Sequence, residues 1–507
     1  MLLFDILTLL ALLLVLAAYC LPIKKRPRWL RHLPLFALVL ALIHLVAEGF
    51  RWQMVPAYAV LVLILLWSGW RSWKSETPAK TGRWVTVRRF AGVSIGIILL
   101  LCSGIFAYLF PMFDLPQPSG SHAVGTSEFH MIDHSRPETY TPDTSDVREL
   151  MVRVWYPAAS VENSEPAYYW REAALRSSEL AKGFGMPSFL FSHAGLIPTH
   201  SFWDAPLSVA QSAYPVLIFS HGFFQGSATQ NTSLVESLAS HGYVVFSIDH
   251  AYIGTISIYP DGRLAVFDRE TFSAMFEPPG PETSALYEEM TATADWREQV
   301  ALLEKAMASI PEQANTVMVD ALAIQQADQL FVLEEITKLQ SGIGRENQPD
   351  LFKGRLDLLR LGIFGMSFGG STALGTCVFD PRCKAGINLD GFQGSQIDLP
   401  PLERPFMFMN NDSFLLYNAM FEKAAGPAYA VSIGGSTHMN FLDTSIMSPL
   451  FQITGALGPI DGYRMLEITE AYVLAFFDKY LKGQNVPLID SPDNDYSEVE
   501  FRKRNAS

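Results

Sequence analysis

The segment Gly365-Met366-Ser367-Phe368-Gly369 is the part of this 507-residue chain that points most directly to chemistry. It matches G-x-S-x-G, a pattern in which a serine occupies a sharp turn between a strand and a helix. The apolar run LGIF precedes Ser367, and the small-residue stretch GGSTALG follows it. Because this context supplies the strand, the tight turn and the start of a helix, we interpret Ser367 as a nucleophile.

A serine hydroxyl needs a base to remove its proton, and in this arrangement the base is a histidine further along the chain. The sequence contains eleven histidines, and only His438 follows Ser367. His438 comes after the predicted strand YAVSIGG, in a loop from which an imidazole can reach across the strand ends. The sequence therefore predicts His438 as the base.

The acid that orients this histidine should lie between the two residues. The carboxylates in that interval are Asp380, Asp390, Asp398, Glu403, Asp412 and Glu422. Asp390 ends the strand pattern AGINLD and Asp412 follows PFMFMNN, so each lies at the carboxyl end of a strand, where catalytic groups gather in parallel sheets. On the residues alone, Asp390 and Asp412 are equally good candidates.

Hydrolysis through a tetrahedral intermediate also requires N–H groups that meet the developing negative charge. One donor should be the residue after the nucleophile, Phe368. The segment FSHGFFQG ends another apolar strand, and its Phe223 N–H is the expected second donor. We interpret His221, in the same segment, as a structural residue.

Short apolar runs alternate with helical patterns along the larger part of the chain. The runs are ELMVRVWYPA, PVLIFSHG, GYVVFSIDH, LGIFGMS, AGINLDG, PFMFMNNDS and YAVSIGGSTH. Continuous apolar strands separated by helices predict an α/β fold with a mostly parallel sheet and helices on both faces. A helical insertion is expected around 254–347, and a closing amphipathic helix should end at Gly483.

The first 110 residues have a different composition. They carry twelve Lys and Arg against three acidic residues, a balance of +9, whereas the whole chain has −14. Apolar stretches at 2–21, 33–47, 54–70 and 90–110 predict about four transmembrane helices. The middle two are near the lower limit of about 17 residues, so a re-entrant hairpin is the alternative for them. Basic residues concentrate in the loops after the first and third stretches, so the positive-inside rule places both termini and everything after 110 outside the cytoplasmic membrane. His44 is expected to be a packed histidine.

The predicted organisation is therefore a transmembrane region at 1–110, a linker at 111–120 and an α/β domain at 121–507. The domain is acidic, which argues against a nucleic-acid partner. We expect no cofactor and no metal. Cys377 and Cys383 are interpreted as buried free thiols, although their spacing also allows a disulfide.

Several motifs together resemble the platelet-activating factor acetylhydrolases and their bacterial relatives. They are AVGTSEFHMIDHSR, ELMVRVWYPA, PVLIFSHGFFQG, LASHGYVVFSIDH, FGMSFGGSTAL, AGINLDGF and GGSTHMNF. The resemblance implies an α/β-hydrolase fold, with Ser367, Asp390 and His438 as the catalytic triad and Phe223 and Phe368 as oxyanion donors. It also favours Asp390 over Asp412, because the acid of this family follows the strand after the nucleophile.

The function implied is cofactor-free hydrolysis of short or oxidised acyl esters, as by a 1-alkyl-2-acetylglycerophosphocholine esterase. The substrate would be a lipid or small-molecule ester, and the enzyme would be a multi-pass protein of the cell membrane. A broad-specificity, dienelactone-hydrolase-like or polyester-type hydrolase is the alternative. A serine peptidase is less well supported because no propeller or lid domain is recognisable, and a non-catalytic receptor because such proteins usually lose a triad residue.

Overall fold

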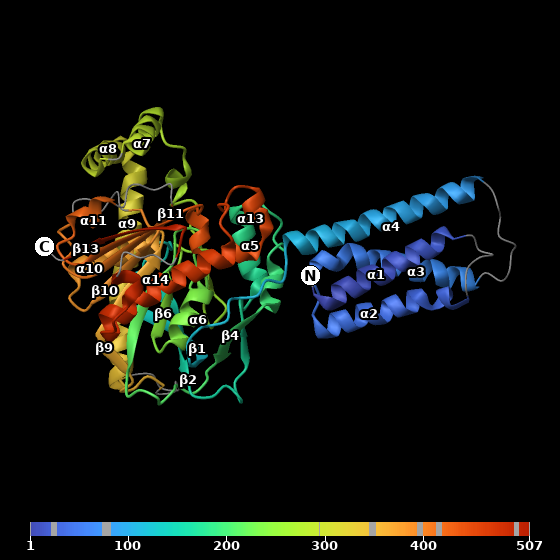
Figure 1. The fold of residues 1–507 in the computed structure, drawn as a ribbon, viewed down its shortest axis with the longest axis horizontal. Coiled ribbons are helices and arrows are strands. Elements are labelled where there is room, and N and C mark those ends of the chain that lie inside the picture. Colours follow the sequence, from blue (N-terminus) through green and yellow to red (C-terminus); the bar gives the residue numbers. More distant parts are fainter. Residues whose placement is uncertain are drawn as a thin grey trace.

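The structure is a computed structural model of the chain, and it describes residues 2–21, 28–73, 83–293, 295–343, 351–392, 399–411, 418–490 and 496–505. It consists of an elongated helical bundle at the N-terminus and a large α/β domain (Figure 1). The expected helices and strands of both parts are present, and their arrangement explains how distant segments of the sequence meet.

In the described residues, eleven strands form one sheet in the order β13-β12-β11-β10-β9-β5-β6-β2-β1-β4-β3. The six central strands, β6, β5, β9, β10, β11 and β12, are parallel to one another. On one side of them β2 pairs antiparallel with β6, and on the other β13 pairs antiparallel with β12. The strands are β1 (Ala123–Pro137), β2 (Val147–Ala158), β3 (Pro166–Tyr168), β4 (Pro198–Trp203), β5 (Tyr214–Ser220), β6 (Val244–Asp249), β9 (Leu356–Met366), β10 (Ala385–Leu389), β11 (Phe406–Asn411), β12 (Ala428–Ile433) and β13 (Val499–Arg504).

Helices cover both faces of this sheet because successive strand residues point to opposite sides. In β5, Val216 and Ile218 belong to one apolar core and Leu217 and Phe219 to the other. The first core is closed by α9 (Glu312–Ser341), α10 (Phe368–Phe379) and α11 (Asn418–Lys423). The second is closed by α6 (Thr232–Ser240) and α14 (Gly462–Lys482), and α14 ends at Gly483 in the left-handed conformation, as expected.

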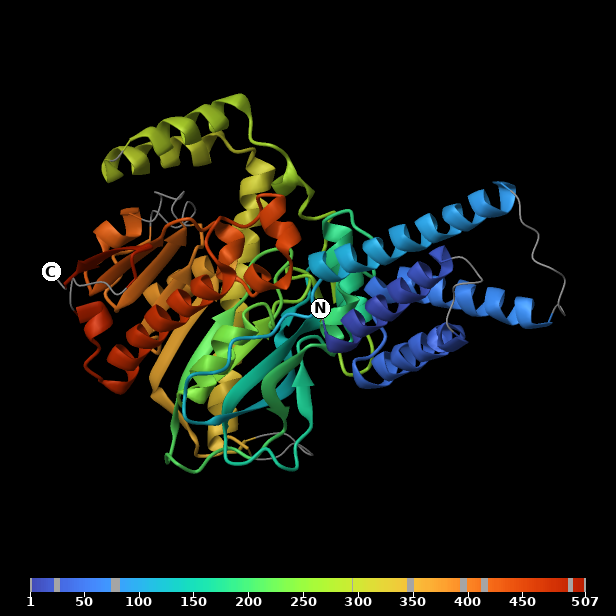
Figure 2. The same cartoon turned by 45° about the vertical axis from the view of Figure 1, so that its right-hand side comes forward.

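The segment between β6 and β9 contains the expected helices. It begins with the hairpin β7 (Ile256–Ile258) and β8 (Leu264–Val266), and continues through α7 (Pro281–Ala292) and α8 (Trp296–Ser309) into α9. Helices α7 and α8 pack against each other and stand clear of the sheet (Figure 2). Phe392, just beyond Asp390, packs against their apolar cluster.

Four helices form the N-terminal bundle: α1 (Leu3–Cys20), α2 (Leu33–Ala47), α3 (Val55–Trp73) and α4 (Arg83–Leu109). In the described residues, three apolar windows are long enough to cross a membrane: Leu3–Cys20, Trp52–Trp70 and Val87–Leu109. Helix α2 has only 15 residues, less than the roughly 20 needed for a full crossing. Large apolar side chains also cover the outer surface of the bundle, among them Leu10, Leu14, Leu63 and Ile98.

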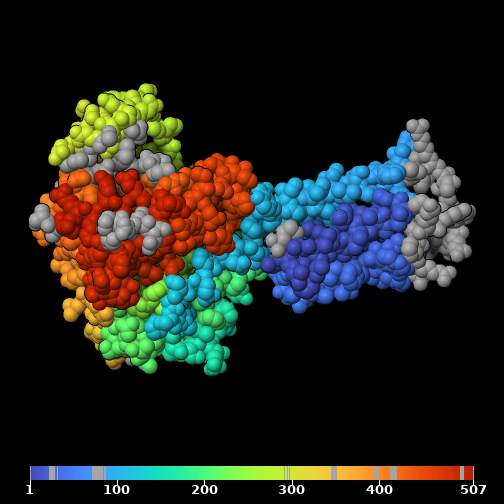
Figure 3. Space-filling view, in the orientation of Figure 1, coloured from blue at the N-terminus to red at the C-terminus, as the bar shows by residue number. Residues whose placement is uncertain are grey.

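One end of the bundle contacts the α/β domain, and the molecule is narrower at this contact than on either side of it (Figure 3). The indole N–H of Trp52 donates to the carbonyl oxygen of Leu190 at 3.1 Å, and the Gln53 side-chain amide donates to that of Phe110 at 2.9 Å. Around them an apolar cluster includes Phe110 of the bundle and Phe451 of α13 (Pro449–Ile453). The chain therefore leaves α4 through a packed contact.

Cys377 and Cys383 form a disulfide, with Cα atoms 5.2 Å apart. The expectation of two free thiols is therefore wrong. Cys377 lies in the last turn of α10, and the turn that follows brings Cys383 back beside it before β10 begins. A spacing of six residues does not reveal such a return.

Candidate active site

Ser367 lies between β9 and α10 with φ 56° and ψ −122°, a conformation that non-glycine residues rarely adopt. The two glycines of the motif make this turn possible. A Cβ atom at Gly365 would lie 2.3 Å from the backbone of Gly369, and one at Gly369 would lie 2.0 Å from the carbonyl oxygen of Ser220. The turn raises the serine hydroxyl from the end of β9, as the motif predicts.

His438 and Asp390 both lie within hydrogen-bonding reach of this position. The Ser367 Oγ is 2.9 Å from His438 Nε2, and His438 Nδ1 is 2.6 Å from Asp390 Oδ2. Asp390 follows β10, and His438 begins the short 3₁₀ helix η8 (His438–Phe441) after β12. The structure thus brings His438 next to Ser367, which lies 71 residues before it, and next to Asp390, which lies 48 residues before it.

Asp390 is held firmly while His438 stays accessible. The Asp390 side chain is 1% exposed and that of His438 is 45% exposed. Asn411 donates its backbone N–H to Asp390 Oδ1 at 2.9 Å and its side-chain amide to Oδ2 at 2.8 Å. Asp412, the other acid considered, lies outside the described residues.

Phe223 and Phe368 both lie close to Ser367. Phe223 follows β5 after His221 and Gly222, and a Cβ atom at Gly222 would lie 3.2 Å from the Cβ of Ser367. Within the described residues, neither the Phe223 N–H nor the Phe368 N–H donates to another protein group. Both N–H groups are therefore available to a ligand, and their rings, 5.5 Å apart, belong to an apolar cluster.

Behind this loop lies a buried polar network that the sequence analysis missed. His250 Nδ1 is 2.9 Å from Asp328 Oδ2, and Arg148 pairs with the same carboxylate at 2.7 Å. Burial alone would raise the pKa of Asp328, but the charge and hydrogen bonds of Arg148 and His250 hold it well below its usual value. Arg148 and Asp328 are 180 residues apart, so no local pattern marks the pair.

His221 belongs to this network. Its Nε2 accepts the backbone N–H of His250 at 2.9 Å, and its Nδ1 lies 2.7 Å from the carbonyl oxygen of Gly222. Burial lowers the pKa of His221 to about 3, so the imidazole is neutral at ordinary pH. A histidine immediately before Gly222 and Phe223 was the only sequence signal of this arrangement.

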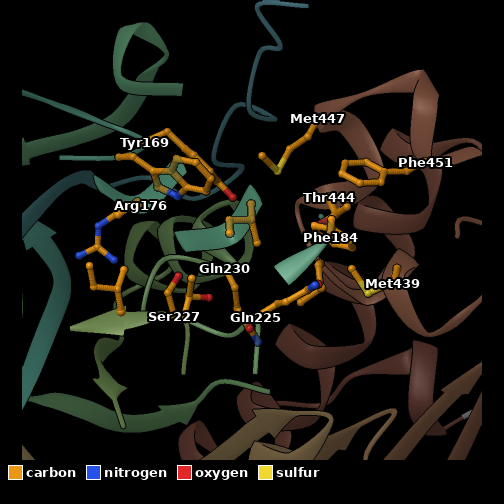
Figure 4. Close-up of a pocket in the computed structure, with 15 residues that line it drawn as sticks. Tyr169, Arg176, Phe184, Gln225, Ser227, Gln230, Met439, Thr444, Met447 and Phe451 are labelled. Atoms are coloured by element: carbon orange, nitrogen blue, oxygen red, sulfur yellow. The ribbon is translucent and has the colours of Figure 1, made fainter. Parts of the chain in front are cut away.

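An apolar pocket lies near the site in the sequence, although Ser367, Asp390 and His438 do not line it (Figure 4). Met439 and Gln225 line it, and they lie next to His438 and close to Phe223 in the sequence. Its remaining lining is mostly aromatic and aliphatic, with Arg176 and a few polar groups, and comprises Tyr169, Trp170, Leu180, Phe184, Ser227, Gln230, Thr255, Ile256, Leu442, Thr444, Met447 and Phe451. A pocket of this kind can hold an apolar ligand group.

Among the described residues, one group of three side chains could in principle bind a metal ion: Asp5, His44 and Glu48. It lies in the bundle, away from Ser367. Arg51 forms an ion pair with Asp5 there, and the Tyr58 hydroxyl lies 2.7 Å from His44 Nδ1. We interpret this group as a buried ion-pair cluster that joins the helices, and His44 is packed, as predicted.

A serine in a sharp turn after a central parallel strand, with a histidine and an aspartate in line, is the arrangement of the α/β-hydrolase class. A model of the family described as platelet-activating factor acetylhydrolase, isoform II, matches residues 108–268 and 282–495 of the chain. The chain therefore belongs to the platelet-activating factor acetylhydrolase family, which confirms the resemblance seen in the motifs.

Individual relatives agree with this assignment. Platelet-activating factor acetylhydrolase of the dog is 24% identical over 388 residues, covering 72% of this chain and 77% of that protein. A probable 1-alkyl-2-acetylglycerophosphocholine esterase of Arthroderma benhamiae is 22% identical over 457 residues, covering 80% of this chain and 98% of the other. The chain is thus of the ester-hydrolase kind.

A solved structure supports the fold. Ferulic acid esterase from Streptomyces cinnamoneus superimposes with a TM-score of 0.55 and 24% sequence identity, covering 77% of this chain and 99% of that one. At this identity the likeness concerns the fold alone. It agrees with the α/β fold and mostly parallel sheet expected from the strand patterns.

Proposed function

We propose that this protein is a serine-dependent carboxylic ester hydrolase that acts through an acyl-enzyme. His438 takes the proton of Ser367 as the hydroxyl oxygen attacks the ester carbonyl, and Asp390 stabilises the resulting imidazolium. The protonated His438 then delivers that proton to the leaving alcohol. Water attacks the acyl-enzyme in the second half of the reaction, again with His438 as base, and releases the acid and free Ser367.

The observation that carries the proposal is the hydrogen-bonded line from Ser367 Oγ to His438 Nε2 and from His438 Nδ1 to Asp390. This order places the base next to the nucleophile and the acid on the far side of the base. The Phe223 and Phe368 N–H groups would bind the negatively charged oxygen of the tetrahedral intermediate. What favours this role is that both residues lie close to Ser367 and that neither N–H is engaged by a described protein group.

For the substrate we propose short or oxidised acyl esters of lipids, as in 1-alkyl-2-acetylglycerophosphocholine. Two relatives named for such activities and the apolar pocket lined by Met439 favour this class. A panel of phospholipids with graded sn-2 acyl length, compared with soluble aryl esters, would test it. Equal or better rates on aryl esters alone would favour the broad-specificity alternative.

We further propose that the α/β domain lies outside the cytoplasmic membrane, held by the N-terminal bundle. Basic residues between the first and second apolar stretches and between the third and fourth favour this orientation. The disulfide between Cys377 and Cys383 agrees with it, since disulfides persist in oxidising compartments. A reporter fused after Ser507 should be active only outside the cytoplasm, and cytoplasmic activity would overturn the orientation.

A fluorophosphonate probe tests the proposed nucleophile directly, because it reacts covalently with an activated serine. We expect the purified full chain to be labelled and the Ser367→Ala variant to be unlabelled and inactive on p-nitrophenyl acetate. Ser371, four residues along α10, offers a matched control, and Ser371→Ala should keep its label. Equal labelling of wild type and Ser367→Ala would refute the proposal.

A further inference from the structure

We propose that His221 is a positioning residue that orients the peptide between Gly222 and Phe223 so that its N–H points at the oxyanion. This inference rests on the proposed function, since it concerns the donor that the hydrolysis would use. His221 would then have a role in catalysis besides packing in the core.

The surroundings fix the tautomer of His221. Its Nε2 receives the backbone N–H of His250 at 2.9 Å, so this nitrogen must present a lone pair. In a neutral imidazole the proton then resides on Nδ1. Nδ1 lies 2.7 Å from the carbonyl oxygen of Gly222 and therefore donates to it.

That hydrogen bond determines where the Phe223 N–H points. The carbonyl of Gly222 and the N–H of Phe223 belong to the same planar trans peptide, in which they point in opposite directions. Holding the oxygen toward His221 therefore turns the N–H away from it. Gly222 adjoins Ser367 closely enough that a Cβ atom there would be 3.2 Å from the serine Cβ. A hydrogen bond to the carbonyl also polarises the peptide and strengthens its N–H as a donor.

His221 is itself enclosed. A Cβ atom at Gly226 would lie 2.4 Å from His221 Nδ1 and 2.0 Å from the Gly222 oxygen. One at Gly254 would lie 2.6 Å from His221 Cε1. These two glycines thus allow the backbone to close around the imidazole and leave it one position.

The partner His250 is fixed in the same way. Its Nδ1–H donates to Asp328 at 2.9 Å, so its Nε2 accepts the hydroxyl of Ser220 at 2.9 Å. Gln329 in turn donates to that hydroxyl oxygen at 2.8 Å. A chain of hydrogen bonds therefore runs from Asp328 on α9 through His250 and His221 to the peptide that carries the Phe223 N–H.

The test compares two substitutions of His221 in the full-length protein. In His221→Asn, the side-chain NH2 occupies the place of Nδ1–H and retains the donor, whereas His221→Leu removes it. Removal of one oxyanion donor typically lowers kcat by about 10² to 10³. We expect His221→Leu to lower kcat by roughly 10² with KM changed less than about threefold, and His221→Asn to stay within about tenfold of wild type.

A second measurement separates positioning from a general structural defect. The affinity for an aryl boronic acid, which forms a tetrahedral anionic adduct on the serine, should weaken in proportion to kcat/KM. His130→Leu serves as the matched control, because His130 pairs with Glu149 outside the site, and it should leave both quantities unchanged. Should His221→Leu fail to fold, Gly226→Ala, which crowds the same hydrogen bond, is expected to give the same proportional loss.

The inference is overturned if His221→Leu keeps kcat within about threefold of wild type, or if His221→Asn is as impaired as His221→Leu. It is also overturned if kcat falls without a matching loss of boronic acid affinity. These outcomes differ from failure of the proposed function, which would appear as absence of fluorophosphonate labelling at Ser367 in the wild type. A labelled wild type with a fully active His221→Leu variant would refute the inference alone.

Discussion

Replacing Asp390 by asparagine tests which nitrogen of His438 carries the proton. Asp390 Oδ1 accepts the backbone N–H of Asn411 at 2.9 Å, and Oδ2 accepts from the Asn411 side chain and from His438 Nδ1. A backbone N–H cannot rotate, so it retains the one oxygen of the new side chain on its own side. The Asn411 side-chain amide can turn over and accept. In Asp390→Asn the NH2 group therefore faces His438.

This arrangement forces His438 into the wrong tautomer. Nδ1 must then accept a hydrogen bond, so the proton moves to Nε2, the nitrogen that should receive the proton of Ser367. The same substitution in a serine protease triad lowers kcat by about 10⁴. Because Asn411 fixes the orientation here, we expect kcat/KM to fall by about 10³ to 10⁴, equivalent to roughly 4 to 5.5 kcal/mol of transition-state stabilisation.

The measurement is kcat/KM on p-nitrophenyl acetate at pH 7.5, together with the rate of fluorophosphonate labelling and a thermal melt. Asp412→Asn is the matched control, since Asp412 is the other strand-end acid, and it should retain activity within about threefold. A larger loss in Asp412→Asn would move the acid to that residue. A loss of less than about tenfold in Asp390→Asn, with Asp412→Asn unaffected, would show that neither of these carboxylates fixes the tautomer.

Two further predictions concern stability. The disulfide closes a short loop, so the double variant Cys377→Ala/Cys383→Ala should lower the free energy of unfolding by about 2 kcal/mol and Tm by about 3 °C. Dithiothreitol should lower the Tm of wild type but not that of the double variant. A lower Tm of both proteins in dithiothreitol would contradict this prediction. Burial raises the pKa of Asp443 to about 7 despite hydrogen bonds from Ser233 and Tyr169. Because this pKa exceeds the unfolded value, the stabilisation present below about pH 4 is lost as pH rises through 7. When the pH rises from 5 to 8, the free energy of unfolding measured in urea should therefore fall by roughly 2 to 3 kcal/mol more in wild type than in Asp443→Asn. An equal fall in both proteins would refute the raised pKa.

The strands and the sharp turn that carries Ser367 could be predicted because their causes are local. An apolar run of five to seven residues, followed by G-x-S-x-G, needs only nearby residues to define a strand, a turn and a helix. The helix before Gly483 was equally predictable, since its apolar residues recur at helical spacing and glycine adopts the left-handed conformation at its end. The antiparallel strand β13 was missed because its exposed charged residues, such as Arg502 and Lys503, hide the alternation.

Features that depend on distant contacts could not be predicted. The pairing of Arg148 with Asp328 joins β2 to α9, and neither residue has a motif around it. The disulfide is different, because its cysteines are only six residues apart and their spacing allowed either state; it depends on how the chain turns after α10.

The placement of Ser367, Asp390 and His438 follows from the order of the strands, and it explains why the sequence offers one candidate base but two candidate acids. Neighbouring strands lie about 4.8 Å apart, and Ser367 and Asp390 end the adjacent strands β9 and β10. His438 follows β12, which lies three strands from β9. The loop that carries it must therefore run back across the carboxyl ends of the strands toward Ser367. Asn440 holds that return, accepting hydrogen bonds from the backbone N–H groups of Thr437 and Gly458, both at 2.8 Å. Any acid at the end of β10 or β11 could meet a histidine brought back in this way, and only the path of the loop decides between them.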